Sequence, residues 1–176
     1  YREGVSKLKM GDPMDPTTTL APLSSQGAVD SLKTQVQGAV AAGAKMEEIP
    51  LEMPNAGSFF RPVILTDVGA ENPARREEFF GPVTLLFRAK DEADAIAIAN
   101  DSPYGLGGSV FTKDEARGVR VAEQIETGMV YINHPTMVKA DLPFGGVLRS
   151  GFGRELIGLG IKEFVNHKLI DVVDID

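Results

Sequence analysis

Between Val83 and Asn133 the chain alternates short apolar runs with helical patterns, and this alternation constrains its fold more than any other feature. The apolar runs contain branched or aromatic residues and end at turn residues, as buried strands do. They span residues 83–89, 106–111 and 129–133. Short connections between alternating strands and helices favour a parallel sheet with right-handed crossovers. The sequence therefore predicts an α/β fold, with ligands outside the carboxyl ends of the strands, near Asn133, His134 and Pro135.

One helix is expected in the N-terminal half of the chain. Ser24 or Ser25 can cap a helix that runs to about Ala42, where Gly43 favours a stop. Apolar residues at spacings of three and four predict one buried face, made of Val29, Leu32, Val36 and Val40.

Two further helices are expected between the predicted strands. The first spans residues 91–100. The second begins at Thr112 and Glu115, which have the spacing of a capping box, and ends at Gly128. Its buried stripe is expected to consist of Ala116, Val119, Ala122 and Ile125.

The remaining segments are less regular. Residues 45–49 and 59–66 are strand candidates, and Pro62 restricts the second to a sheet edge or a bent segment. The helical pattern that begins at Tyr1 has no cap, which indicates that an upstream segment has been removed. Residues 168–175 have a strand pattern without a local partner, so we expect them to be covered or to pair with another chain.

Composition narrows the possible function classes. The 176 residues are enough for one domain with a substantial core. The net charge is −7 without a basic patch, so neither nucleic acid nor an anionic membrane is an expected partner. No run reaches the about 18 apolar residues of a membrane span, and no signal-peptide pattern is visible, which fits a cytoplasmic protein. The absence of cysteine excludes disulfides, thiolate catalysis and cysteine-based zinc sites within this chain.

The segment Glu77–Val83 places two carboxylates and two aromatic rings before a Gly-Pro turn and a predicted strand. A carboxylate and a ring held side by side at the start of a strand suit a ligand that has hydroxyl groups and a flat heterocycle. The same pattern also arises when an exposed glutamate pair precedes an aromatic residue of the core. The residues alone leave both interpretations open.

Other polar and glycine-rich segments are weaker candidates for a site. Residues 151–153 lack the third glycine and the leading strand of a dinucleotide-binding loop, so turn and packing roles are favoured. His134 and His167 lack the spacing of a metal site, and no metal ligands are predicted. Lys139 and Arg149 lie in a long loop, where they either meet an anionic substrate or remain solvated charges.

One order of motifs extends across essentially the whole chain: Glu77–Pro82, Asn100–Leu106, Pro143–Gly146 and Ser150–Glu155. In this order and spacing the motifs resemble the NAD(P)-dependent aldehyde dehydrogenases. The stretch from Phe144 to Glu163, with the tail, is most similar to bacterial succinate-semialdehyde dehydrogenases. The resemblance implies that residues 1–165 are the C-terminal part of a parallel-sheet catalytic domain. Residues 166–176 would be an oligomerisation strand that makes the enzyme a homo-oligomer.

The resemblance also implies roles for particular residues. Glu78 matches the carboxylate that accepts hydrogen bonds from the nicotinamide ribose, and Phe80 matches the ring beside the nicotinamide. Phe144 matches an aromatic wall of the aldehyde tunnel. The loop of residues 134–142 resembles the loop at the substrate entrance, where some succinate-semialdehyde enzymes use a serine to hold the distal carboxylate. This chain has Lys139 there, so either its charge substitutes for the serine or the substrate differs.

For the parent enzyme, the resemblance implies oxidation of a semialdehyde, such as succinate semialdehyde, to the acid with NAD or NADP. In the family, the nucleophilic cysteine and the general-base glutamate lie upstream of the matching region. No catalytic residue is therefore assigned here, and this chain alone is expected to be inactive. Two alternatives stay open: a non-catalytic binding or assembly module, and a relative that acts on acyl phosphates or other activated acids.

Overall fold

The computed structural model describes residues 1–175, and the chain divides into two compact units, with the boundary between Lys90 and Asp91. Each unit combines helices with a pair of parallel strands, which confirms the predicted α/β fold class. Within residues 1–175, no helix is long and apolar enough to cross a membrane.

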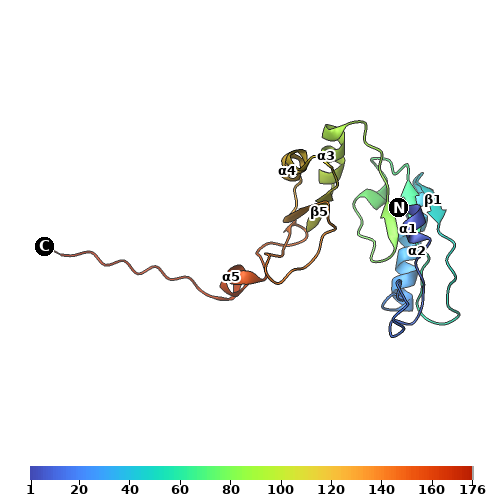
Figure 1. Cartoon of the computed structure of the whole chain (residues 1–176), viewed down its shortest axis with the longest axis horizontal. Coiled ribbons are helices and arrows are strands. Elements are labelled where there is room, and N and C mark those ends of the chain that lie inside the picture. Colours follow the sequence, from blue (N-terminus) through green and yellow to red (C-terminus); the bar gives the residue numbers. More distant parts are fainter. Residues whose placement is uncertain (176) are drawn as a thin grey trace. The chain divides into compact units, whose positions relative to one another are not determined.

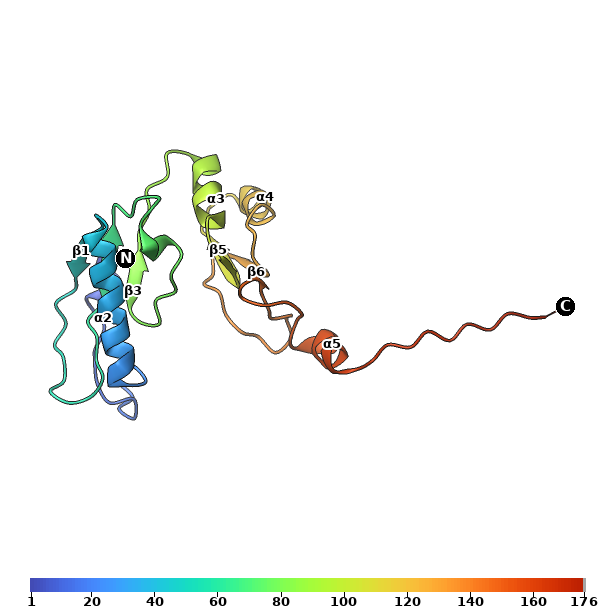
Figure 2. The same cartoon turned by 180° about the vertical axis from the view of Figure 1, so that it is seen from behind.

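In the first unit, the long helix α2 lies beside a sheet with the strand order β1-β2-β3 (Figures 1 and 2). Strand β1 pairs with β2 antiparallel, and β3 pairs with β2 parallel. The elements are α1 (Arg2–Val5), α2 (Gln26–Ala41), β1 (Lys45–Glu48), β2 (Val63–Thr66), the 3-10 helix η1 (Pro73–Arg75) and β3 (Val83–Leu85).

Strand β2 is the centre of the first unit's core. Val63 and Leu65 belong to a buried cluster that includes residues of α2, whereas Ile64 belongs to a second cluster with Ile49. A strand buried in this way is central, so the prediction of an edge or bent strand is wrong. The strand begins after Pro62, whose missing N–H is therefore not needed for pairing, and the Pro62 carbonyl accepts a hydrogen bond from Ile49 N at 2.8 Å.

Helix α2 begins at the predicted cap. The hydroxyl of Ser25 accepts a hydrogen bond from Ala28 N at 3.1 Å, which satisfies one of the free N–H groups of the first turn. The buried residues of the helix are Val29, Leu32, Val36 and Ala39. The sequence predicts Val40 as the fourth buried residue, but Val40 is exposed. Ala39 is buried in its place, in the cluster that also contains Val63 and Ala74, and Asn72 donates to its carbonyl at 2.8 Å.

The second unit contains two small sheets. Strand β5 pairs with β6 parallel, and β4 pairs with β7 antiparallel. The elements are α3 (Glu92–Asn100), β4 (Tyr104–Gly105), β5 (Gly107–Val110), α4 (Glu115–Ala122), β6 (Met129–Ile132), β7 (Val147–Leu148), α5 (Ile157–Gly160) and the 3-10 helix η2 (Ile161–Phe164). The predicted parallel pairing is found within each unit, between β2 and β3 in the first and between β5 and β6 in the second.

Helices α3 and α4 each have an aspartate cap. Asp91 accepts from Asp94 N at 2.8 Å, and Asp114 accepts from Arg117 N at 3.0 Å. The predicted capping box is therefore wrong, since the Thr112 hydroxyl instead accepts from Asp114 N. Arg117 also forms an ion pair with Glu92 at 2.5 Å, and this carboxylate raises the pKa of the guanidinium by hydrogen bonding and charge.

Helix α4 packs through Gly118, and only Ala122 and Ile125 of the predicted apolar stripe are half-buried. Ala116 and Val119 are exposed, whereas Gly118 is the buried residue of the helix. A methyl group at position 118 would lie 3.0 Å from Ile132 Cγ2 and Thr112 Cγ2, so the helix approaches β6 closely there. The close contact of the Gly118 backbone thus takes the place of packing by the side chains of Ala116 and Val119.

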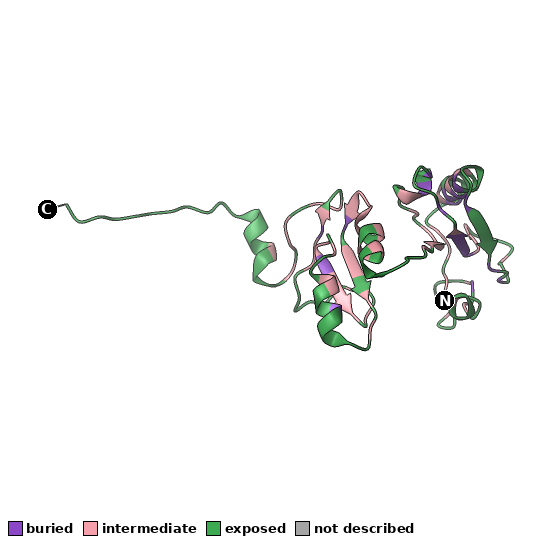
Figure 3. Ribbon diagram, turned by 90° about the horizontal axis from the view of Figure 1, so that it is seen from above, coloured by how far each residue is buried: buried purple, intermediate pink, exposed green. Residues whose placement is uncertain are grey.

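The end of the described chain is extended. Residues 166–175 form no helix and no strand within the described part of the chain, and they are exposed throughout (Figure 3). Their apolar side chains, Leu169, Ile170, Val172, Val173 and Ile175, are all more than three-quarters exposed. The pairing of this segment with another subunit stays a prediction.

Candidate functional site

The loop of residues 77–83 is held by helix α2 and strand β2. The Gln35 side chain on α2 donates a hydrogen bond from Nε2 to the Glu78 carbonyl at 3.2 Å. Gly81 lies directly against Leu32, so that an added Cβ atom would be only 2.4 Å from Leu32 Cδ2. The carbonyl of Pro82 accepts from Val63 N, the first residue of β2, at 2.9 Å. The backbone of this loop is therefore fixed at three places.

The two aromatic rings of this loop have different surroundings. Phe79 packs against the buried cluster around α2 and β2, whereas Phe80 is 77% exposed. Glu77 and Glu78 are exposed as well. The two interpretations of this segment thus apply to different residues: Phe79 is a core aromatic, and Glu78 and Phe80 are open to a ligand. An exposed ring on a fixed loop, next to a carboxylate, is suited to pack on a flat heterocycle.

In the second unit, Phe144 lines a hollow of about 530 Å³. Its backbone forms a two-way bridge with Glu155: Phe144 N donates to the Glu155 carbonyl at 3.1 Å, and Glu155 N donates to the Phe144 carbonyl at 2.7 Å. Other apolar side chains around the hollow are Leu106, Phe152, Leu156 and Phe164. The arrangement offers an apolar wall to a small ligand.

The backbone around Phe144 packs closely on another turn of the chain. Gly128 lies against Gly145 and Gly146, the two residues after Phe144. A Cβ atom added at Gly128 would be only 2.0 Å from the Gly145 carbonyl oxygen. Arg154 Nη1 also donates to the Gly146 carbonyl at 2.9 Å. A side chain at position 128 has no space unless the segment that carries Phe144 moves.

Replacing Gly128 with alanine should therefore destabilise the full-length protein by about 1–3 kcal/mol, the usual range for overpacking. Denaturant unfolding measures this loss of stability. Gly158→Ala is the matched control, because nothing lies within 4 Å of a methyl group there. Equal stability of the two variants would contradict the close contact.

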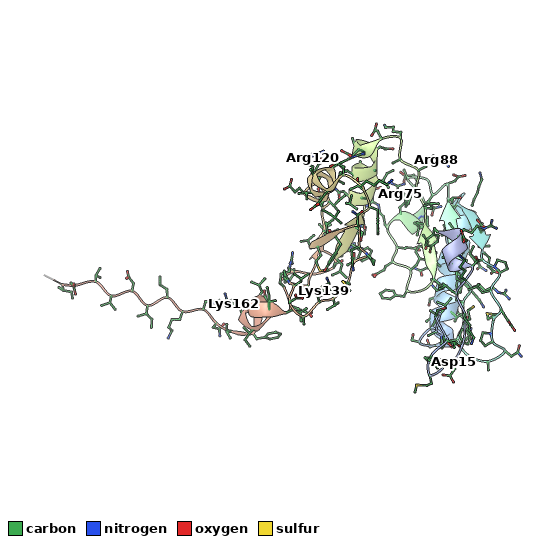
Figure 4. All side chains as sticks on the ribbon, viewed as in Figure 1. Asp15, Arg75, Arg88, Arg120, Lys139 and Lys162 are labelled. Atoms are coloured by element: carbon green, nitrogen blue, oxygen red, sulfur yellow. The ribbon has the colours of Figure 1, made fainter. Side chains whose placement is uncertain are left out.

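Lys139 lies in an exposed part of the loop that follows β6 (Figure 4). The loop starts at Asn133, whose side-chain amide donates to and accepts from the Thr112 backbone at 2.8 Å each. The Tyr131 hydroxyl donates to the Met137 carbonyl at 3.0 Å, two residues before Lys139. The loop is thus tied to β6, while the ammonium group of Lys139 is open to solvent and to any anionic ligand.

The predicted site residues fall into two pairs. Glu78 and Phe80 share a loop of the first unit, and Lys139 and Phe144 lie on one long loop of the second. Sequence reasoning missed Gln35, for which no motif gives a signal, although its place three residues after Leu32 puts both on one side of α2. Within residues 1–175, no group of three or more histidine, aspartate or glutamate side chains could hold a metal ion.

Comparisons with known proteins extend over nearly the whole chain. The sequence model of the aldehyde dehydrogenase family matches residues 1–170. The chain belongs to the aldehyde dehydrogenase family. This confirms the family resemblance of the four motifs. It also assigns the two units described above to an aldehyde dehydrogenase.

Two curated relatives of this aldehyde dehydrogenase chain carry the same name. It is 51% identical to succinate-semialdehyde dehydrogenase [NADP(+)] of Deinococcus radiodurans, over 97% of this chain and 37% of that protein. It is 43% identical to the protein of the same name from Mycobacterium avium, over 97% of this chain and 36% of that protein. The chain therefore spans a little over a third of the length of the curated relatives it matches.

A solved structure agrees with these relatives. The crystal structure of succinic semialdehyde dehydrogenase from Streptococcus pyogenes in complex with NADP⁺ matches with a TM-score of 0.92 and 41% identity. The match covers 98% of this chain and 38% of that one. The fold of this chain is thus that of the corresponding third of an aldehyde dehydrogenase.

Proposed function

We propose that the chain is part of an NADP⁺-dependent dehydrogenase that oxidises succinate semialdehyde, or a similar semialdehyde, to the carboxylic acid. The relatives named for this reaction support the proposal through their identity to nearly all of the chain. The observation that carries it is the exposure of both Glu78 and Phe80, two residues apart on a fixed loop. An exposed ring and an exposed carboxylate on the same loop are suited to a nucleotide cofactor.

The residues present fit the nicotinamide end of such a cofactor. The carboxylate of Glu78 accepts hydrogen bonds, and the two neighbouring hydroxyl groups of a ribose donate them. The exposed ring of Phe80 offers an apolar surface for the nicotinamide. When bound, the nicotinamide supplies the acceptor for a hydride. Glu78 and Phe80 would hold it in one orientation, and orientation of reacting groups contributes on the order of 7–11 kcal/mol to catalysis in favourable cases.

A thiol nucleophile for the proposed reaction would have to lie outside these 176 residues. A covalent route for aldehyde oxidation uses a thiol, and the 176 residues contain no cysteine. We therefore propose that this chain supplies cofactor and substrate contacts but no catalytic residue. Alone, it should show no turnover of succinate semialdehyde.

An assay of the full-length protein tests the proposed function. With succinate semialdehyde and NADP⁺ alone, it should form succinate and NADPH, and neither phosphate nor coenzyme A should be required. A requirement for either would favour the alternative of an acylating relative. The intact mass of the protein in the cell distinguishes the other alternative, because a protein of this chain's length would be a binding or assembly module.

Replacing Lys139 with methionine tests the contact to the substrate carboxylate. We expect the KM for succinate semialdehyde to rise by about 1.4- to fivefold, since exposed ion pairs contribute about 0.2–1 kcal/mol. The KM for an uncharged aldehyde of the same chain length should not change, because it has no carboxylate to lose. If both KM values rise together, Lys139 shapes the loop and does not recognise charge.

A further inference from the structure

The loop that carries Glu78 and Phe80 runs along one turn of helix α2. Its first contact is the hydrogen bond from Gln35 Nε2 to the Glu78 carbonyl at 3.2 Å. Its second is the packing of Gly81 on Leu32, three residues away in both the loop and the helix. Residues three apart on a helix are neighbours on the same face of the helix. The segment 78–81 is therefore held at both ends by a single turn of α2.

The two contacts differ in kind. Leu32 is only 1% exposed and belongs to the core, so its position is set by the packing of the whole unit. Gln35 is half-buried at the border of that core, and its contact with the loop is one directed hydrogen bond. Between the two contacts lies Phe80, which projects from the loop. The hydrogen bond thus fixes the backbone at Glu78, the residue from which the carboxylate side chain extends.

We infer that Gln35 is a positioning residue for the cofactor: through the Glu78 carbonyl, it holds the carboxylate and the neighbouring ring in their binding orientation. This inference rests on the proposed function, because it assumes that Glu78 and Phe80 contact the nicotinamide end of NADP⁺. Gln35 itself touches the backbone of the loop and is not a catalytic residue. Its loss should therefore affect cofactor binding more than aldehyde binding or folding.

The test measures NADP⁺ binding to the full-length protein by calorimetry, together with the KM values for both substrates. In Gln35→Ala the Kd and the KM for NADP⁺ should rise about three- to tenfold, the range expected for one lost hydrogen bond. The KM for the aldehyde and the melting temperature should stay near those of the unchanged protein. Gln35→Lys keeps an N–H donor on a long side chain and should restore most of the NADP⁺ affinity.

Gln37→Ala is the matched control, because Gln37 is exposed on the same helix and its side chain makes no hydrogen bond within residues 1–175. Its NADP⁺ affinity should not change. The inference is overturned if Gln35→Ala binds NADP⁺ normally, or if the Gln35 and Gln37 variants lose affinity equally. The variant Glu78→Gln separates this failure from that of the proposed function. If Glu78→Gln weakens NADP⁺ binding and Gln35→Ala does not, only the positioning role is wrong.

Discussion

Replacing Glu78 with glutamine in the full-length protein should weaken NADP⁺ binding by about 10- to 100-fold, because hydrogen bonds to a charged group contribute about 1.5–3 kcal/mol each. The side chain is exposed and its backbone carbonyl is already bound by Gln35, so the change should leave the fold intact. The maximal rate should fall as well, since the nicotinamide would be less well oriented. Calorimetry and steady-state kinetics measure the two effects.

Glu77→Gln is the control for this prediction. Glu77 is equally exposed and adjacent in sequence, and it carries the same charge. A general effect of negative charge on cofactor binding would appear in both variants. If the glutamine variants at 77 and 78 have the same affinity for NADP⁺, the role assigned to Glu78 is wrong.

Replacing Leu32 with alanine should produce the largest loss of stability, about 2–5 kcal/mol of the free energy of unfolding. Leu32 is among the largest fully buried side chains of the described residues, and its Cδ2 atom lies where a side chain on Gly81 would lie. The cavity left by the substitution would therefore open beneath the loop that carries Glu78 and Phe80. We expect a lower melting temperature together with a higher KM for NADP⁺.

Denaturant unfolding of the full-length protein checks this prediction, and Val40→Ala on the same helix is the control. Val40 is exposed, so its truncation should lower the free energy of unfolding by no more than about 0.5 kcal/mol. Similar losses in the two variants would contradict the packing of α2 described above. A stability loss without any change in NADP⁺ binding would show that Leu32 supports the core but not the loop.

The sequence predicted helix α2 well because local signals and tertiary packing agree there. The Ser25 cap and three of the four residues of the buried face are as expected. The fourth could not be predicted, since the burial of Ala39 depends on packing with residues distant in sequence, such as Val63 and Ala74. The partner of each strand could not be predicted for the same reason: alternation of strands and helices predicts parallel pairing, but the choice of partner depends on tertiary packing.

The candidate site was predictable only in part. A run of two glutamates and two phenylalanines does not say which ring lies in the core, and the structure distinguishes the buried-side Phe79 from the exposed Phe80. The supporting residues were not predictable at all. Gln35 and Gly128 are ordinary residues in the sequence, and their contacts join segments that are far apart along the chain.

A structure of the full-length protein with NADP⁺ bound tests the central claim most directly. We predict that the carboxylate oxygens of Glu78 lie about 2.5–3.0 Å from the hydroxyl groups of the nicotinamide ribose, the distance of a hydrogen bond. The ring of Phe80 should be in contact with the nicotinamide. A nicotinamide ribose bound elsewhere, with Glu78 still exposed to solvent, would contradict the assignment of this loop to the cofactor.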